Sequence, residues 1–550
     1  MADNYNVGVM LKARAAEHPD RPALIFAAGP QASFAELDRL SDRFAAGFTA
    51  KGLAREDRVL FLFKPSIDFY AALFGAIKMG AIPVLVDPGM GIKNVLKCIE
   101  EIAPKAMIAL SAVHAVATFA RAPFKSTNLR ITAGRRWFWG GPTLEQCLGP
   151  DEPYTIPNFA AADEVGIVFT SGSTGLPKGV SYTHGIFHGV ATLADARIGR
   201  EAGRTYLECF AAYVLFDVAQ GMTSVVPDID LSKPAKADPV KVLDAIQRFG
   251  CTGGFASPAI LRSLFRHCAT TGTELPNFSH VLTGVAPIPA DMHRGLRAAN
   301  PSATLHVVYG ATEGMTVAHT NTAMVLDHTW ERTGKGDGNC VGTPFPTIDT
   351  RIIAITDDAL PTLADVVEVP DGEMGELLIG GPVVSPEYKD RPKANALSKV
   401  AGEGRIWHRT GDIFWRDEDG RLWFCGRMSH RLRTANGMVP AVPVEGIYND
   451  MTGVRRTALV GLGESGNERP VLLVELDGGV DAWNAEFEKR LLARATGSLW
   501  EGIVQAAMPH PGFPVDARHN SKIRRNDLKV WAQANAPQTL LTDSSATPAG

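Results

Sequence analysis

One ten-residue segment, Thr170 to Gly179, limits most strictly what this chain can fold into. It reads Thr-Ser-Gly-Ser-Thr-Gly-Leu-Pro-Lys-Gly and follows an apolar run, Val165–Phe169, that predicts a buried strand. Glycines let the backbone come close to a ligand and direct several N–H groups at it, while hydroxyls and Lys178 add donors. The segment therefore predicts a polyphosphate-binding loop and disfavours a flexible polar linker. It differs from the P-loop of nucleoside triphosphatases, because Gly179 stands where that motif needs Ser or Thr.

The composition is that of an ordinary globular protein. Its 550 residues are 45% hydrophobic and 21% charged, which implies two or more domains with sizeable cores. The formal net charge of -4 gives no sign of nucleic acid or an anionic membrane as the main partner. Seven scattered cysteines form no Cys-x-x-Cys pair, so we expect reduced thiols and no structural zinc site.

The sequence contains no pattern typical of secretion or membrane insertion. The N-terminal residues lack a basic stretch followed by an apolar run, so they do not predict a signal peptide. The most apolar stretch, Phe69–Val86, is interrupted by Lys78, Gly80 and Pro83 and is too broken to span a bilayer. We therefore expect a cytoplasmic protein without a transmembrane segment.

Helical and strand-like segments alternate along the chain. Apolar residues recur at helical spacing from Ile67 to Gly80, where we expect the helix to end. A short strand follows over residues 81–86, and Pro83 suits its beginning or a sheet edge. The pattern favours an α/β fold with largely parallel sheets over the alternative, a mixed α+β fold. Other expected elements are a helix over Pro239–Phe249 and strands over Val165–Phe169, His280–Thr283 and Leu305–Val308.

The character of the sequence changes after residue 337, where short β-rich runs lie between Gly, Pro and Asp turns. We expect a large domain over residues 1–426, with stacked parallel or mixed sheets, helices and a β-rich subdomain. A small, mobile α+β domain is expected over 427–533 and a flexible tail over 534–550. The strands expected in these regions are Thr350–Ile355, Gly375–Ile379, Arg421–Phe424, Thr457–Gly461 and Val471–Glu475.

The order of residues in the phosphate loop, with Thr183-His184 shortly after it, resembles that of the adenylate-forming superfamily. This group includes acyl-CoA synthetases, firefly luciferase and peptide-synthetase adenylation domains. The resemblance covers about residues 5–532. It implies ATP and Mg²⁺ as cofactors and a carboxylate substrate that becomes an acyl-adenylate. The residues that it assigns to the phosphates are Thr170, Ser171, Gly172, Ser173, Thr174, Gly175 and Lys178.

Further segments stand in the superfamily's order. Tyr309-Gly310-Ala311-Thr312-Glu313 implies that Thr312 touches the α-phosphate and that Glu313 holds Mg²⁺, which prefers oxygen ligands. Arg409-Thr410-Gly411-Asp412 implies that Asp412 binds the ribose hydroxyls. Seen alone, Glu313 would be a surface carboxylate and Asp412 a turn residue. The resemblance adds to the nucleotide site Gly284 and Ala286 beside the adenine, together with Tyr309, Gly310 and Arg427.

The segment Asn520–Arg525 resembles the one that carries the superfamily's catalytic lysine. Lys522 matches that lysine, and its charge would stabilise the α-phosphate and the carboxylate as they approach each other. Without the resemblance, this segment would be read as a basic surface patch. Together with Lys522, the resemblance makes Thr312 and Glu313 candidate catalytic residues.

The hinge departs from the superfamily pattern. After Gly426-Arg427 the chain continues Met428-Ser429-His430, so Ser429 stands at the usual pivot and His430 replaces the usual Asp. These departures, with the segment Phe513–Lys522, are similar to the β-lactone synthetases of bacterial long-chain olefin biosynthesis. That similarity implies a long-chain 2-alkyl-3-hydroxy fatty acid, whose own 3-hydroxyl displaces AMP and closes a four-membered lactone. No acceptor thiol would be needed.

Three alternatives stay open at this point. An acyl-CoA ligase would form the same adenylate, a kinase-like transferase would release ADP or phosphate, and an inactive scaffold would only bind the nucleotide. The resemblance leaves open self-association and assembly with other olefin-biosynthesis enzymes. We also expect an apolar acyl pocket, although each of its candidate residues could equally be plain core. These candidates are Leu215, Phe216, Phe255, Ala256 and Val285.

Overall fold

The predicted strand Val165–Phe169 is β7 (Glu164–Thr170) in a sheet of order β6-β5-β3-β4-β7-β8. The computed structural model describes residues 4–170, 177–284, 286–515 and 523–537. Neighbouring strands in this sheet are parallel except β8, which returns antiparallel to β7. Their carboxyl ends therefore share one edge, where the phosphate loop leaves β7. The other strands are β3 (Arg58–Leu62), β4 (Ile82–Leu85), β5 (Ala106–Leu110), β6 (Leu129–Ala133) and β8 (Lys178–Thr183).

Helices cover both faces of this sheet. The helix predicted after Ile67 is confirmed as α3 (Ile67–Met79), which ends at Gly80 in a left-handed conformation with φ of 84°. All of its residues from Phe69 onward are buried, including Lys78, which is paired with two aspartates. Side chains of α2 and α3 pack on one face, and those of α4 and α5 on the other. The helices are α1 (Val7–Glu17), α2 (Phe34–Ala50), α4 (Ile92–Ile102) and α5 (Ser111–Phe119).

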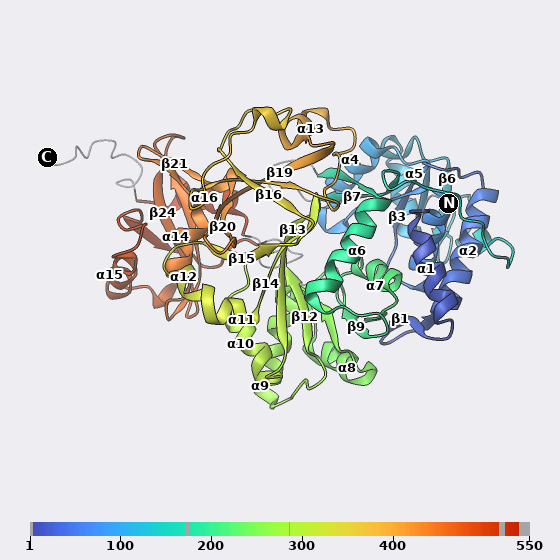
Figure 1. Cartoon of the computed structure of the whole chain (residues 1–550), viewed down its shortest axis with the longest axis horizontal. Coiled ribbons are helices and arrows are strands. Elements are labelled where there is room, and N and C mark those ends of the chain that lie inside the picture. Colours follow the sequence, from blue (N-terminus) through green and yellow to red (C-terminus); the bar gives the residue numbers. More distant parts are fainter. Residues whose placement is uncertain (1–3, 171–176, 285, 516–522, 538–550) are drawn as a thin grey trace.

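A longer sheet crosses the middle of the molecule (Figure 1). Its first block is parallel, with α6 (His184–Ile198) and α7 (Tyr213–Gln220) on one face. The opposite face is covered by α8 (Pro239–Phe249), α9 (Pro258–Thr271) and α10 (Ala290–Ala299). The strands of this block are β1 (Pro22–Phe26), β10 (Thr223–Val226), β9 (Thr205–Glu208), β11 (Gly253–Phe255), β12 (His280–Gly284) and β13 (Thr304–Ala311), with β2 (Gln31–Ser33) at the edge.

Beyond β13 the same sheet becomes antiparallel and forms the predicted β-rich region. The turn between β13 and β14 and the segment that precedes β18 both contact β8 of the first sheet. The antiparallel strands are β14 (Gly314–Asn321), β15 (Asn339–Pro344), β16 (Asp349–Ile353), β17 (Gly375–Gly380), β18 (Lys399–Gly402), β19 (Arg405–Arg416) and β20 (Leu422–Arg427).

After Arg427 the described strands belong to separate small sheets. These elements lie at the far end of the molecule's long axis from the β3–β7 sheet (Figure 1). They touch the larger part through Trp500, whose Nε1 donates to the Gly336 carbonyl at 2.8 Å, and through Arg431, which binds Asp357 at 2.9 Å. The elements are β21 (Leu432–Thr434), β22 (Gly437–Val439), α14 (Ala441–Asn449), β23 (Val454–Leu462), β24 (Arg469–Leu476), α15 (Ala485–Leu492), β25 (Ala506–Pro509) and α16 (Arg525–Asn535).

The structure agrees closely with the elements expected from the sequence, and α8 has the predicted bounds. The expectation for Pro83 needs one refinement. It is the second residue of β4, as expected for a strand's beginning, but β4 lies inside the sheet rather than at its edge. Pro83 is tolerated there because the paired register with β7 begins one residue later, at Val84. The cysteines are free thiols, and no helix among the described residues is long and apolar enough to cross a membrane.

Candidate active site

The phosphate loop is the connection of the β7–β8 hairpin. Thr170 is paired with Lys178 across the two strands, so the ends of the loop are held side by side. Lys178 begins β8 and is half-buried. The predicted phosphate-binding residues Ser171, Gly172, Ser173, Thr174 and Gly175 lie outside the described residues.

A segment distant in the sequence lies alongside β8. The Lys389 N–H donates to the Gly179 carbonyl at 2.8 Å, and Tyr388 forms a β-bridge with Val180. These contacts place the Tyr388 ring beside Lys178, whose Nζ lies 4.4 Å from the ring centroid. The structure thus adds Tyr388 to the phosphate site, which the sequence motifs did not indicate.

The turn between β13 and β14 delivers Thr312 and Glu313 to the same place. The Tyr182 hydroxyl donates to the Thr312 carbonyl at 2.6 Å, and the Ser385 N–H donates to the Glu313 carbonyl at 2.8 Å. The Tyr388 hydroxyl then donates to the Glu313 carboxylate at 2.6 Å. Two of the predicted residues, Lys178 and Glu313, therefore meet on either side of one tyrosine.

Gly310 is required for this turn to close. A Cβ there would lie 2.8 Å from the Thr316 nitrogen and 2.9 Å from the Gly314 carbonyl oxygen, which is closer than side chains are found. Any larger residue would force the two strands apart and displace Glu313. The predicted nucleotide-site residue Gly310 therefore has a backbone role in this structure.

The phosphate site carries an excess of positive charge. Burial lowers the pKa of Lys178, and the Glu313 carboxylate opposes that shift. Lys399, at the start of β18, is buried with its Nζ 2.6 Å from the Ser385 carbonyl and 5.3 Å from the Tyr388 ring centroid. Burial lowers the pKa of Lys399 to about 7, while Glu313 again opposes the shift. Two lysines around one carboxylate suit a ligand with several negative charges.

The donor set at Glu313 fits Mg²⁺ bound together with a polyphosphate. Among the described residues no cluster of three or more metal-ligating side chains occurs. Glu313 would therefore supply a single carboxylate, with its Oε1 oriented by Tyr388. Magnesium commonly takes one or two protein carboxylates and completes its coordination with phosphate oxygens and water, so a lone oriented carboxylate suffices.

A second predicted cluster forms around Asp412 on β19. The Tyr309 hydroxyl donates to Oδ2 of Asp412 at 2.7 Å, and Nε of Arg427 lies 3.0 Å from Oδ1. The Asp412 carboxylate raises the pKa of Arg427, and burial raises the pKa of Tyr309 well above its usual value. The Tyr309 ring packs edge-on against Phe414 at 4.9 Å. A carboxylate oxygen can accept more than one hydrogen bond, so Asp412 can also accept from ligand hydroxyls.

The predicted adenine loop follows β12. Gly284 is paired with Val308, and a Cβ on Gly284 would lie 2.8 Å from the Val308 carbonyl oxygen. A glycine here allows β12 and β13 to approach closely just before the loop. Ala286 is half-buried in that loop, and Val285 lies outside the described residues.

Three of the predicted acyl residues, Leu215, Phe216 and Phe255, lie together on one face of the longer sheet. Ala256 does not join them, because it packs into the cluster on the opposite face with side chains of α8, α9 and α10. Phe216 of α7 stacks on Phe187 of α6 at 4.4 Å between ring centroids, and Phe255 of β11 stacks on Tyr213 at 4.3 Å. Leu215, Phe216 and Phe255 are each less than 10% exposed. Phe216 and Phe255 form a continuous aromatic wall with Phe187 and Tyr213. This wall matches both the predicted pocket lining and the alternative of plain core.

A buried ionic cluster stands beside this wall and was not expected. Arg200 contacts Asp217 of α7 and lies 3.9 Å from Glu208 at the end of β9, and all three side chains are at most 2% exposed. Burial raises the pKa of Glu208 to about 8 despite Arg200. The sequence held a signal that could have revealed it, because Glu208 and Asp217 each interrupt an apolar run.

The predicted hinge follows the end of β20. Met428–His430 form a single 3₁₀ turn after Arg427, so Ser429 and His430 stand between the larger part and β21. Burial, with the nearby charges of Arg525 and Arg427, lowers the pKa of His430 to about 3, so this histidine is neutral. A neutral imidazole replaces the acidic group usual at this position.

The predicted catalytic residue Lys522 lies outside the described residues, as does the rest of 516–522. The residues on both sides of this segment are fixed. Val515 and Ile523 form a β-bridge, and Arg525 makes two bonds to the carboxylate of Glu445. The two described residues nearest to Lys522 along the chain, Val515 and Ile523, are therefore paired with each other.

The histidines close to the motifs have structural partners. His184 accepts a hydrogen bond from the Val7 N–H at 3.2 Å, and His306 and His319 are in contact through their ring nitrogens at 3.0 Å. Burial lowers the pKa of His184 to about 4 and that of His306 to about 3. These contacts give each of the three histidines a structural role.

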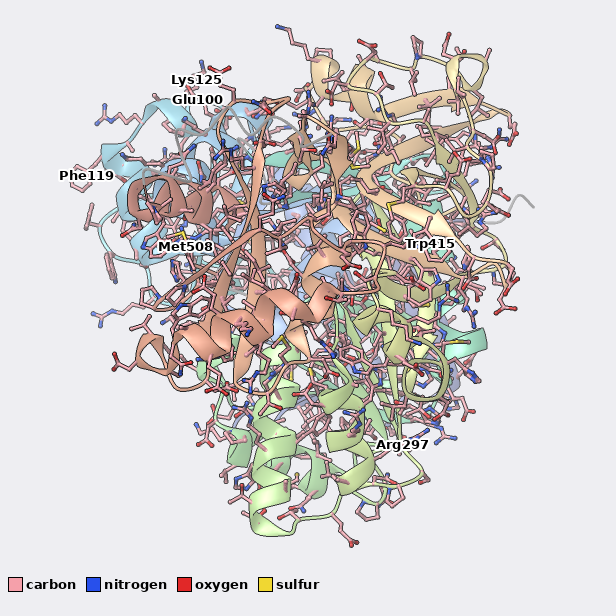
Figure 2. All side chains as sticks on the ribbon, turned by 90° about the vertical axis from the view of Figure 1, so that its left-hand side faces the viewer. Glu100, Phe119, Lys125, Arg297, Trp415 and Met508 are labelled. Atoms are coloured by element: carbon pink, nitrogen blue, oxygen red, sulfur yellow. The ribbon has the colours of Figure 1, made fainter. Side chains whose placement is uncertain are left out.

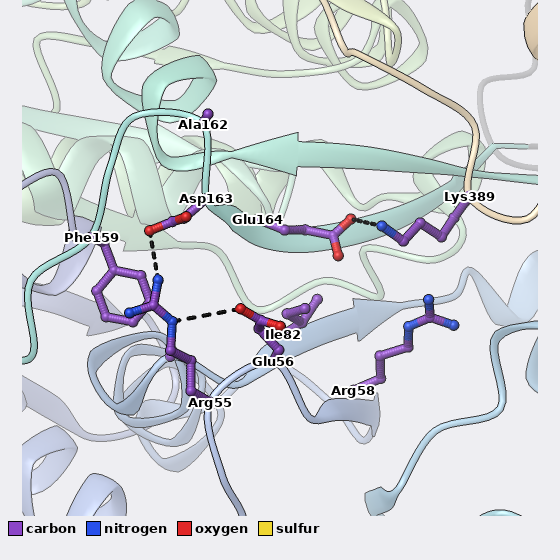
Figure 3. A pocket seen from close by; sticks show the side chains of 10 residues that line it. Arg55, Glu56, Arg58, Ile82, Phe159, Ala162, Asp163, Glu164 and Lys389 are labelled. Carbon is purple, nitrogen blue, oxygen red and sulfur yellow. Dashed lines mark hydrogen bonds and ion pairs between the residues drawn. The ribbon is translucent and has the colours of Figure 1, made fainter.

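A surface cavity of about 330 Å³ lies away from the nucleotide residues. Figure 3 shows its charged lining, in which Arg55 binds Asp163 and Lys389 binds Glu164. Glu164 begins β7, whereas the phosphate loop follows the end of that strand. Its lining residues do not include Lys178, Glu313 or Asp412, so this cavity is separate from the site built from those residues.

Comparisons with known proteins agree with this geometry. The profile described as AMP-binding enzyme matches residues 11–389. The olefin beta-lactone synthetase of Stenotrophomonas maltophilia is 39% identical over 96% of this chain and 98% of its own length. The one from Xanthomonas campestris pv. campestris is 40% identical over 96% of this chain and 97% of its own. Among solved structures, ATP-bound MatB from Rhodopseudomonas palustris superposes with a TM-score of 0.78 at 20% identity, over 96% and 99% of the two chains.

Proposed function

Because the chain belongs to the AMP-binding enzyme family, we propose that it is an ATP-dependent, AMP-forming ligase that makes a β-lactone. The substrate is a long-chain 2-alkyl-3-hydroxy fatty acid, and the products are the lactone, AMP and pyrophosphate. The observation that carries the proposal is the full-length similarity, at 39 and 40% identity, to two olefin beta-lactone synthetases. The similarity includes the hinge and the small C-terminal sheets, not the phosphate loop alone.

The first half-reaction forms an acyl-adenylate. A carboxylate oxygen of the substrate attacks the α-phosphorus, and the bond to the β-phosphate breaks to release pyrophosphate. Lys178 and the loop backbone hold the phosphates, and Tyr388 orients Glu313. When bound, Mg²⁺ would neutralise phosphate charge at Glu313. Asp412 fixes the ribose, and Lys522 stabilises the charge that gathers at the α-phosphate.

The second half-reaction is intramolecular. The oxygen of the 3-hydroxyl attacks the adenylate carbonyl, the bond to AMP breaks, and the hydroxyl proton leaves to a base or to solvent. The hydroxyl and the carbonyl are part of one molecule, so binding in a fixed conformation replaces the entry of a second substrate. The altered hinge, with Ser429 and a neutral His430, fits a reaction that does not have to present the adenylate to a thiol.

The remaining assignments belong to the same proposal. The aromatic wall around Phe216 and Phe255, with Leu215 and Val285, lines the acyl site. Two domains meet at Arg427, the larger over 1–426 and the smaller over 427–533, and the small one brings Lys522 to the nucleotide. The enzyme works in the cytoplasm, either alone or in an assembly with other olefin-biosynthesis enzymes.

A labelling experiment tests the adenylate and the lactone together. The hydroxy acid, labelled with oxygen-18 in its carboxylate, is incubated with ATP and Mg²⁺ in the absence of any thiol. We expect label in AMP and a neutral lactone formed in equal amount. Label in inorganic phosphate would indicate an acyl-phosphate route. AMP that accumulates only after CoA is added, together with a thioester, would establish the acyl-CoA ligase alternative instead.

A further inference from the structure

The residues between Ile102 and Leu144 carry a net positive charge, although the whole chain is negatively charged. This segment holds six Lys and Arg residues and no Asp or Glu, whereas the chain has a net charge of -4. Lys105 is paired with Asp57 at 2.6 Å, whereas Arg121 and Arg136 donate to backbone carbonyls. The adjacent helix α4 balances two lysines against two glutamates, so it does not offset the excess. The outer edge of the first sheet is therefore strongly basic.

The outward face of α5 is apolar, which is the reverse of an ordinary surface helix. Ala112, Val116 and Phe119 are exposed and follow each other at helical spacing, and Phe119 is 83% exposed. The polar residue His114 points inward and bonds the Ile131 carbonyl at 2.9 Å. Figure 2 shows Phe119 extending outward at the periphery of the molecule.

The loop after β6 adds two more exposed aromatic side chains to the same edge. Trp137 is 56% exposed and Phe138 is 69% exposed. The loop is anchored by Trp139, whose ring stacks on His114 at 5.3 Å and whose Nε1 donates to Thr132 at 3.0 Å. The buried Trp139 side chain holds the loop in place, and the loop keeps Trp137 and Phe138 on the surface.

A cavity of about 360 Å³ opens at the end of α5. Three cationic side chains line it, those of Arg121, Lys125 and Arg130, together with the hydroxyl-bearing residues Thr118 and Thr127. Both hydroxyls donate to backbone carbonyls, Thr118 to that of His114 and Thr127 to that of Pro104, so the three cations would bind the ligand. Guanidinium and ammonium groups around such a cavity suit a phosphate group. The apolar face and this cavity lie next to each other.

We propose that this surface, the α5 face, docks on a bilayer that contains anionic phospholipids. It consists of α5, the loop over residues 134–138 and the cavity just described. Phe119, Trp137 and Phe138 enter the headgroup region, where aromatic rings are favoured, while the cations bind lipid phosphates. A bilayer is favoured over an acidic protein because the substrate proposed above is a long-chain acid that partitions into lipid. In that one respect the inference rests on the proposed function.

Vesicle sedimentation with the full chain tests the proposal in the absence of ATP and substrate, so its result does not depend on the proposed reaction. We compare vesicles of phosphatidylcholine alone with vesicles that also contain phosphatidylglycerol. We expect binding to the anionic vesicles and its loss at high salt. One variant combines Phe119→Ser, Trp137→Ser and Phe138→Ser. A second combines Arg121→Gln, Lys125→Gln and Arg130→Gln.

The second variant should bind about 100-fold more weakly, because each basic residue near an anionic surface strengthens binding about fivefold. The aromatic variant should lose binding to a similar degree. The matched control changes two exposed apolar residues elsewhere, Leu499→Ser and Val530→Ser, which are 85% and 65% exposed, and should bind like the unmodified protein. All three should keep ATP–pyrophosphate exchange with detergent-dispersed substrate.

Three results would overturn the proposal. Equal weak binding to both kinds of vesicle would exclude a lipid surface and leave an acidic protein as the partner of this face. An equal loss of binding in the control variant would mean that general hydrophobicity causes the binding. Release of the protein from anionic vesicles by inorganic phosphate at unchanged ionic strength would make the cavity a free-phosphate site.

Discussion

The role proposed for Asp412 gives the most quantitative prediction. Asp412→Asn keeps the volume of the side chain but removes its charge. Hydrogen bonds to a charged acceptor contribute about 1.5–3 kcal/mol each, so two ribose hydroxyls account for about 3–6 kcal/mol. Asn retains one acceptor oxygen, which places the expected loss near the lower limit. We expect KM for ATP to rise about 10²-fold, with a much smaller change in kcat.

Deoxynucleotides make this test specific. In the unmodified protein, 2′-deoxyATP or 3′-deoxyATP loses one hydrogen bond and should bind about 10–100-fold more weakly than ATP. In Asp412→Asn, by contrast, the deoxynucleotides should bind almost as well as ATP does to the same variant. The hydrogen bond that the missing ribose hydroxyl would make to residue 412 is already weakened by the substitution. The assay is ATP–pyrophosphate exchange over a range of nucleotide concentrations. If the penalties of mutation and deoxygenation simply multiply, Asp412 does not contact the ribose.

The control for this series is Asp419→Asn. Asp419 precedes β20, and its side chain is 61% exposed in a pair with Arg421. It should leave KM for ATP unchanged. In Asp412→Asn, Arg427 keeps access to water because its side chain is 40% exposed. The fold should therefore tolerate the change, and thermal unfolding midpoints of the two variants should agree closely.

Three other substitutions test neighbouring roles. Lys522→Ala should slow adenylate formation about 10²–10³-fold while KM for ATP stays unchanged, and loss of ATP binding would contradict that role. Tyr388→Phe keeps the ring beside Lys178 but removes the hydrogen bond to Glu313. The Mg²⁺ concentration for half-maximal activity should rise about tenfold, and an unchanged titration would refute the orienting role. Lys399 has a pKa of about 7 in the folded protein and 10.5 unfolded, so the unfolded chain binds more protons between these values. Stability should therefore rise with pH across this window by up to about 1.4 kcal/mol per unit, and Lys399→Met should abolish that rise in urea unfolding at pH 7, 8 and 9. If the difference in unfolding free energy between the unmodified protein and Lys399→Met does not change with pH, this prediction is contradicted.

The sequence predicted those parts of the site whose chemistry is contiguous along the chain. In the phosphate loop the residue types themselves indicate a polyphosphate, whereas the roles expected for Glu313 and Asp412 came from the resemblance of their short segments to the adenylate-forming superfamily. Tyr388 and Lys399 could not be found this way, because they reach Glu313 through pairing with β8 and through the start of a distant strand. Only the tertiary fold brings these segments together.

The docking proposed for the α5 face would revise the expectation drawn from the net charge. A total of -4 gave no sign of an anionic membrane as the main partner, but a total averages over a surface whose charges are not evenly spread. The basic segment between Ile102 and Leu144 became significant only when α5 and the loop after β6 were found on one exposed edge. For the same reason the aromatic wall around Phe216 could be predicted only as a group of apolar residues. Which of them touch depended on the packing of α6, α7 and β11.

The pairing of Tyr388 and Lys389 with β8 also affects how such enzymes can exchange parts. The phosphate site is assembled from β8, the turn at Glu313 and the residues from Ser385 to Lys399, and none of these pieces is complete without the others. A hybrid of two relatives that takes β8 from one parent and the Tyr388 segment from the other would join surfaces that were not selected together. Exchange at the Arg427 joint, by contrast, leaves this assembly intact. Recombination between relatives should therefore succeed more often at the joint than anywhere between β8 and Lys399.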